Sequence, residues 1–97
     1  MADPAAPAEP RQLVEHFFRH ESARLVAVLA RAFGLRYLDL VEDQVQEALL
    51  IASRTWGQRG IPANPSGWIY RVARNRVLDA LRRDRIHQRA LTLAGQT

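Results

Sequence analysis

The sequence has no cysteine, no lysine and no long apolar run. Without cysteine, disulfides and thiolate metal sites are excluded, and no segment approaches the roughly 20 apolar residues that cross a bilayer. Residues 1–10 are rich in alanine and proline and lack the basic start and apolar middle of a secretory signal. We therefore expect a cytoplasmic protein with no membrane partner, and a disordered N-terminal arm over residues 1–10.

Charge is unevenly distributed along the 97 residues, which allow one domain. Residues 1–50 contain five arginines and eight acidic residues, a net charge of −3, whereas residues 51–97 contain nine arginines and two acidic residues, a net charge of +7. The exclusive use of arginine is typical of a chain shaped by genomic base composition. The asymmetry itself indicates a nucleic-acid surface in the second half, because guanidinium groups bind phosphates and guanine edges.

Apolar residues at helical spacing predict three helices, and no strand pattern or repeat is visible. The first helix is predicted from Arg11 to Phe33, before Gly34, with an apolar stripe of Leu13, Val14, Phe17, Phe18, Leu25, Val28, Leu29 and Ala32. The second is predicted from Asp39 to Trp56, where Asp39 and Glu42 have capping-box spacing and Gly57 and Gly60 end the helix. Its stripe consists of Val41, Val45, Ala48, Leu49, Ala52 and Trp56.

The third helix is predicted to start at Pro65 after an Asn64 cap and to reach Arg83 or Arg89. These elements indicate an all-α fold, a compact three-helix or four-helix bundle over residues 11–89. Residues 90–97 are expected to form a flexible tail.

The third helix has an arginine-rich polar surface. At 100° per residue, Arg71, Asn75 and Arg82 share one sector, which suits phosphate and base contacts, and Arg74 and Arg85 share another flank. Asp79 is spaced to neutralise Arg76 or Arg83, and a solvated face with internal ion pairs is the alternative. Exposed Trp68 or Tyr70 would stack on unpaired bases, whereas Trp68 also fits the core.

Two further segments suggest binding. The loop over residues 57–65 either forms a pocket for one extruded base or merely connects two helices. On the second helix a leucine stands among polar residues opposite the apolar stripe, either as a helix-docking surface or as a stray exposed leucine. That outward face consists of Asp43, Gln46, Glu47, Leu50 and Arg54.

Catalytic patterns are scarce. His16 and His20 are four residues apart on the first helix, so a metal pair is geometrically possible, but no third ligand is evident and Phe17 and Phe18 are expected in the core. No phosphate loop or nucleophile–base pattern occurs. We expect no cofactor, no metal and no enzymatic activity. The alternative is a small metal-dependent hydrolase that would use His16, His20 and a glutamate.

Two segments together resemble region 2 of bacterial RNA polymerase sigma factors, most closely the extracytoplasmic-function class. They are Val-Glu-Asp-Gln-Val-Gln-Glu-Ala at residues 41–48 and Trp-x-x-x-x-Ala-Arg-Asn-x-x-x-Asp-x-x-Arg-Arg at residues 68–83, with Trp56 between them. The resemblance covers about residues 14–89. It implies a sigma-factor domain that binds core RNA polymerase and recognises and melts the minus-ten promoter element.

The resemblance also implies roles for individual residues. The second helix would dock on the β′ clamp helices through Asp43, Gln46, Glu47, Leu50 and Arg54. The non-template single strand of the minus-ten element would be bound by Gln58, Arg59, Asn64, Ser66, Tyr70, Arg71, Arg74, Asn75, Arg82 and Arg83. An anti-sigma factor is a further conceivable partner.

The chain departs from that family in one respect. A complete factor also has region 4, for the minus-thirty-five element, and the residues after Arg89 are too few to encode it. We therefore expect an excised domain or an unusual stand-alone protein with weakened promoter selection. The alternative function is a helical protein-interaction or regulatory module without sequence-specific DNA binding.

Overall fold

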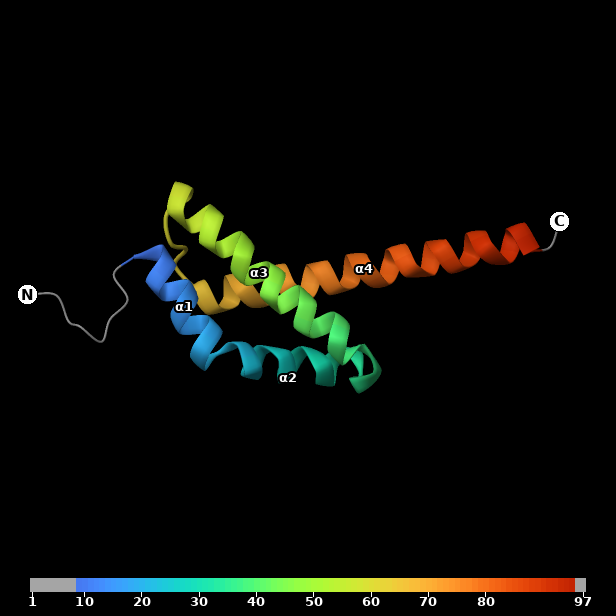
Figure 1. Cartoon of the computed structure of the whole chain (residues 1–97), viewed down its shortest axis with the longest axis horizontal. Coiled ribbons are helices and arrows are strands. Elements are labelled where there is room, and N and C mark those ends of the chain that lie inside the picture. The colour runs from blue at the N-terminus through green and yellow to red at the C-terminus, as the bar shows by residue number, and fades with distance from the viewer. Residues whose placement is uncertain (1–8, 96–97) are drawn as a thin grey trace, which may run out of the picture.

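The computed structural model describes residues 9–95, which are almost entirely helical and contain no strand. The elements are α1 (Pro10–His20), α2 (Ser22–Phe33), a 3-10 turn (Leu35–Tyr37), α3 (Leu38–Arg59) and α4 (Pro65–Gly95). Helix α3 packs against each of the other helices, and α4 crosses it and projects well past the rest of the molecule (Figure 1). The expected all-α fold is confirmed, in its four-helix form.

The first predicted helix is wrong in one respect, because the chain bends at Glu21 and divides it into α1 and α2. The Ser22 hydroxyl donates a hydrogen bond to the Phe18 carbonyl oxygen at 2.7 Å, the local back-bonding that often accompanies helix bends. The bend lets α1 and α2 follow different parts of α3. As a result Phe17 and Leu25 are buried, whereas Phe18 remains 58% exposed instead of lying in the core.

The start of α3 differs from the expected capping box. Its N-cap is Tyr37, without a side-chain cap hydrogen bond, and Asp39 lies inside the first turn. A carboxylate in the first turn still favours the helix, because it faces the positive end of the helix dipole.

The end of α3 also differs, since Gly57 does not stop the helix. It continues to Arg59 and ends at Gly60, whose φ of 89° is costly for any residue with a Cβ. Gly34 ends α2 in the same way, with φ of 110°. The connection before α4 is therefore only residues 60–64.

The core forms around α3, and its entire predicted apolar stripe is buried. Trp56 is 1% exposed, and its ring lies edge-on to those of Phe17 and Trp68, with centroid distances of 6.4 and 5.3 Å. Such arrangements add to the hydrophobic stabilisation of large buried rings. From α4 the core receives Ile69, Ala73 and Val77.

Helix α4 begins as predicted. The Gly67 amide donates to Asn64 Oδ1 at 3.1 Å, and the Trp68 amide donates to the Asn64 carbonyl oxygen at 3.0 Å. The helix reaches Gly95, so residues 90–95, which lie in the expected flexible tail, are helical. Of the expected N-terminal arm, Pro10 is the first residue of α1, and residues 1–8 lie outside the described range.

Candidate nucleic-acid and protein interfaces

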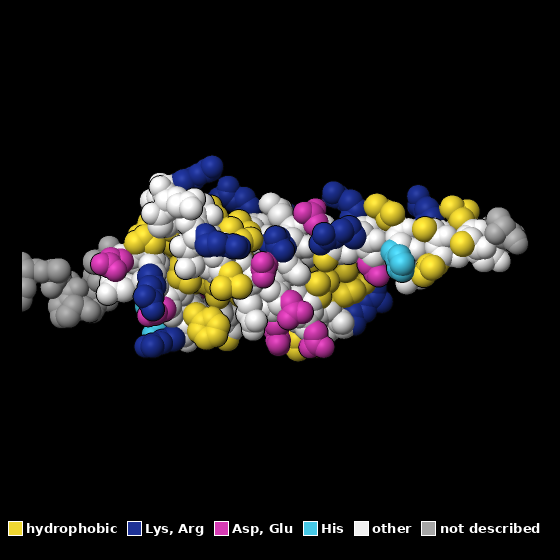
Figure 2. Space-filling model, turned by 45° about the horizontal axis from the view of Figure 1, so that its top comes forward, with side chains coloured by type: hydrophobic (Ala, Val, Ile, Leu, Met, Phe, Trp, Pro, Cys, Tyr) yellow, Lys and Arg dark blue, Asp and Glu magenta, His cyan; other side chains and the backbone are white. Residues whose placement is uncertain are grey.

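The face of α4 opposite the buried row is open to solvent. Ile69, Ala73 and Val77 are fully buried, whereas Arg71 and Asn75 are exposed on the other side of the same turns. Arg74, Arg82 and Arg83 are exposed as well, and from Arg82 onward every described residue of α4 is exposed. Figure 2 shows arginine side chains along α4 into its projecting end.

Two arginines of α4 have protein partners. Arg82 lies 3.7 Å from Asp79 in an exposed pair, so the expectation that Asp79 neutralises Arg76 or Arg83 is wrong. Arg76 instead donates through Nε to Gln44 Oε1 of α3 at 2.9 Å. Within residues 9–95, no ion pair or side-chain hydrogen bond engages Arg71, Arg74 or Arg83, so these guanidinium groups are available to an anionic ligand.

The residues expected in the loop are divided between two helices. Gln58 and Arg59 are exposed in the last turn of α3, at the end of the helix rather than in the connection. Asn64 caps α4, so its side-chain Oδ1 already accepts a hydrogen bond from the Gly67 amide. Ser66 is exposed in the first turn of α4. The geometry therefore brings Asn64 and Ser66 together and separates Gln58 and Arg59 from them.

A hollow of about 410 Å³ lies between α2 and the start of α4. Its α4 side is formed by Ser66, Gly67 and Tyr70 together with the cap residue Asn64, and Tyr70 is half-buried rather than freely exposed. Its other side consists of Arg24, Leu25 and Val28 of α2 and of Glu21, the N-cap residue at the bend. Sequence reasoning missed Glu21 and Arg24, because they lie within an apparently continuous predicted helix and precede the residues they meet by 40 positions or more.

Trp68 belongs to the core rather than to an exposed stacking surface. It is half-buried at the α3–α4 contact, where its ring meets Trp56.

The outward face of α3 is polar and mainly exposed. Asp43, Gln46 and Arg54 are exposed, Glu47 is half-buried, and Leu50 is 58% exposed. The first half of this helix has four acidic residues and no basic one: Asp39, Glu42, Asp43 and Glu47. Acidic side chains gather near the lower middle of the view in Figure 2.

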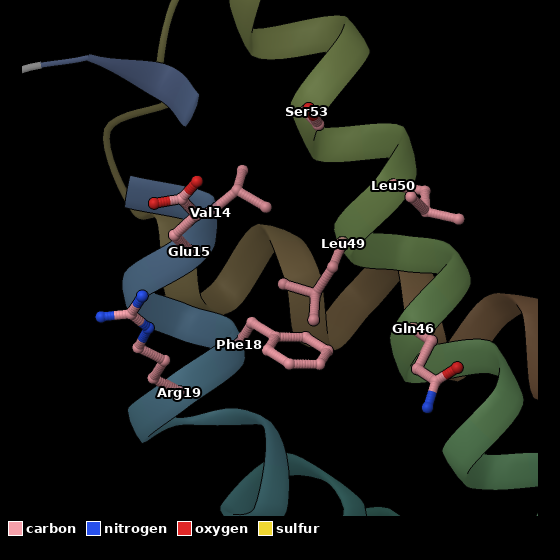
Figure 3. A pocket seen from close by; sticks show the side chains of 8 residues that line it. All are labelled: Val14, Glu15, Phe18, Arg19, Gln46, Leu49, Leu50 and Ser53. Atoms are coloured by element: carbon pink, nitrogen blue, oxygen red, sulfur yellow. The ribbon is translucent and has the colours of Figure 1, made fainter. Parts of the chain in front are cut away.

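A groove of about 600 Å³ adjoins this acidic α3 face. Figure 3 shows Phe18 reaching from α1 toward α3, with Leu49 facing it and with Gln46 and Leu50 projecting from α3. Val14 adds to the apolar wall on α1. Sequence reasoning misplaced Phe18, because its spacing fits the apolar stripe of a straight helix, and Val28 of the same predicted stripe is 45% exposed as well.

The two histidines of α1 lie close together, with ring centroids 4.8 Å apart. Within residues 9–95 there is no group of three or more His, Cys, Asp or Glu side chains placed to hold a metal ion. In the same range, no helix has both the length and the apolar character needed to cross a membrane.

Comparison with known proteins gives a family match. Residues 17–86, more than half of the chain, match the family model described as Sigma-70 region 2. An uncharacterized protein of Rhizobium meliloti (strain 1021) is 40% identical over 62 residues, a match that covers 64% of this chain and only 15% of that protein. No solved structure matches.

Proposed function

Because the chain belongs to the Sigma-70 region 2 family, we propose that it is the region 2 domain of an extracytoplasmic-function sigma factor. Membership supports interaction with core RNA polymerase and recognition of the minus-ten promoter element in general. The finer proposal is that α3 docks on the β′ clamp helices while the loop and α4 hold the non-template single strand. The chemistry is binding rather than catalysis.

The observation that supports this division is the separation of charge between two helices. The first half of α3 has four acidic residues and no basic one, whereas α4 contains seven arginines and two aspartates. One domain with two oppositely charged faces suits an adaptor between a protein and DNA. Each face attracts its own partner and repels the partner of the opposite face.

On the DNA side, Arg71, Asn75 and Arg82 form the central face of α4. Arginine contacts to phosphate fix the position of the strand, and asparagine can bind adenine through two hydrogen bonds. From Arg71 to Arg82 the helix rises about 16 Å, long enough to follow several nucleotides. Arg74 and Arg83 widen this cationic surface, and Gln58 and Arg59 at the end of α3 would contact a different part of the strand.

Strand opening then follows from selective binding of unpaired DNA. The protein can bind the base only when it is extruded from the duplex. Its capture therefore shifts the equilibrium toward melted promoter. No bond is made or broken in this step.

On the polymerase side, Leu50 lies among Asp43, Gln46, Glu47 and Arg54. An exposed leucine ringed by polar and acidic groups fits a partner helix with an apolar anchor and basic residues around it. The adjoining groove extends this surface, since Gln46 and Leu50 line it together with Phe18. An anti-sigma factor that covered the same surface would exclude the polymerase.

The test compares binding of two single strands, a non-template minus-ten strand and a scrambled strand, with and without a peptide of the β′ clamp helices. We expect preference for the minus-ten strand and saturable binding of the clamp peptide. Clamp binding without any strand preference would instead favour the alternative, a protein-interaction module. Absence of both activities would contradict the proposal.

A further inference from the structure

We propose that the hollow between α2 and α4 receives the extruded promoter base, that Glu21, the N-cap residue of α2, determines which base is held, and that Arg24 of α2 binds the adjoining phosphate. This inference rests on the proposed function. It assigns base discrimination to the bend before α2, which is outside both the loop and the arginine face. The hollow, about 410 Å³, falls within the range of small-ligand sites, roughly 300–1,000 Å³.

The hollow combines one acceptor-only group with several donors. Glu21 contributes a half-buried carboxylate, and Arg24 contributes a guanidinium at the exposed side. Leu25 and Val28 form an apolar wall against which a flat base can lie. Neither Glu21 nor Arg24 forms a side-chain ion pair or hydrogen bond within residues 9–95, so both can contact a ligand.

The capping geometry of α4 explains why Glu21 is needed. Asn64 would be the natural reader of a base edge, but its Oδ1 accepts the hydrogen bond from the Gly67 amide. With Oδ1 engaged, the amide group can offer a base chiefly its Nδ2 donor. The strong acceptor that remains on the wall is the Glu21 carboxylate.

An acceptor-only group discriminates among bases. Cytosine, adenine and guanine each have an exocyclic amino group that can donate to a carboxylate, as glutamate accepts from cytosine N4. Thymine has no amino group, and its one donor on this edge, N3–H, lies between two carbonyl oxygens that a carboxylate repels. The hollow should therefore favour an amino-bearing base over thymine.

The hollow continues into the flank of α4 that carries Arg74. Gly67, Tyr70 and Arg74 have spacings of three and seven residues, which place them on one side of the helix. A strand with its base between Tyr70 and Glu21 would thus have its backbone near Arg74 on one side and near Arg24 on the other. Arg24 then acts on the phosphate, and Glu21 acts on the base.

The experiment measures fluorescence anisotropy of the folded 97-residue protein with non-template minus-ten strands in which each position is varied in turn. At one position we expect amino-bearing bases to bind about tenfold more tightly than thymine, the scale of one good base contact. Glu21→Gln, which is isosteric and can accept or donate, should reduce this ratio to about twofold. Glu15→Gln, an exposed substitution on α1, is the matched control and should leave it unchanged.

Removing the amino group from the DNA gives a second measurement that does not depend on folding of a variant. At the discriminating position, cytosine is replaced by 2-pyrimidinone, or adenine by unsubstituted purine. The wild-type protein should lose affinity about as it does with thymine, and Glu21→Gln should lose much less, which completes a double-mutant cycle. Arg24→Ala should weaken all strands alike and reduce the salt slope by about 0.7, whereas Arg31→Ala on the same helix should not.

The outcomes separate this inference from the proposed function. If the wild-type protein does not prefer the minus-ten strand over a scrambled strand, both fail. If the wild-type protein does prefer the minus-ten strand, two results would overturn only the assignment to Glu21 and Arg24. One is an equal preference for amino-bearing bases over thymine in the wild-type protein and Glu21→Gln. The other is unchanged wild-type affinity when the amino group is removed from the base.

Discussion

The arginine face of α4 makes a quantitative prediction about salt. We consider the double substitution Arg71→Ala and Arg82→Ala, which removes two cations from the exposed side of the helix without touching the core. The Arg82–Asp79 pair is 3.7 Å long and exposed. Pairs of this kind contribute only about 0–1 kcal/mol, so this one should not prevent Arg82 from binding phosphate.

The magnitude follows from counterion release. Each phosphate contact with a single strand contributes about −0.7 to the slope of log affinity against log salt. Losing two contacts should make the slope shallower by about 1.4. Between 50 and 200 mM salt, the affinity advantage of the wild-type protein over the double variant should therefore shrink about sevenfold.

The assay is a series of anisotropy titrations at four or five salt concentrations, with minus-ten and scrambled strands. Both strands should show the shallower slope, because phosphate contacts do not read sequence. Arg76→Ala is the matched control, because the Arg76 guanidinium is hydrogen-bonded to Gln44 of α3 and is not expected to bind phosphate. It should retain the wild-type slope while lowering the free energy of unfolding by about 1 kcal/mol. Indistinguishable slopes for the wild-type protein and the double variant would refute this use of the arginine face.

Three other substitutions test the rest of the molecule. Leu50→Asp should weaken capture by β′ clamp helices at least tenfold without changing the thermal unfolding midpoint, and equal capture would rule out this docking face. Asn64→Ala should lower the free energy of unfolding in urea by about 1 kcal/mol, whereas Asn64→Ser keeps a capping oxygen and should cost much less; equal losses would contradict the cap. Trp56→Ala should cost about 3–5 kcal/mol and leave little folded protein, so a cooperative urea transition near that of the wild type would contradict the core as described.

Much of the fold could be predicted because amphipathic periodicity is a local property. The stripe from Val41 to Trp56 is buried in full, since each member follows the helical repeat and faces one side of α3. The start of α4 was also predictable, because Asn64 and Pro65 form a cap that depends only on neighbouring residues.

The failures occur where local signals allow two outcomes. Gly57 can sit inside a helix at modest cost, and the packing of Trp56 one residue earlier favours continuation to Arg59. Phe18 fits the apolar stripe if the first helix is straight, yet the bend at Glu21 turns it toward solvent. Asp79 had more than one arginine within reach by spacing, and the interhelical bond of Arg76 to Gln44 leaves Arg82 as its partner.

By itself, the sequence determined which sides of its helices are apolar, acidic or rich in arginine, because side-chain order along a helix sets those sides. Only the tertiary structure decided which sides of different helices meet. Glu21 and Arg24 share a hollow with Ser66 and Tyr70 because α3 holds α2 and α4 apart and the bend at Glu21 sets the direction of α2. Such contacts between distant parts of the chain have no periodicity of their own, since they depend on how several buried surfaces are packed at once.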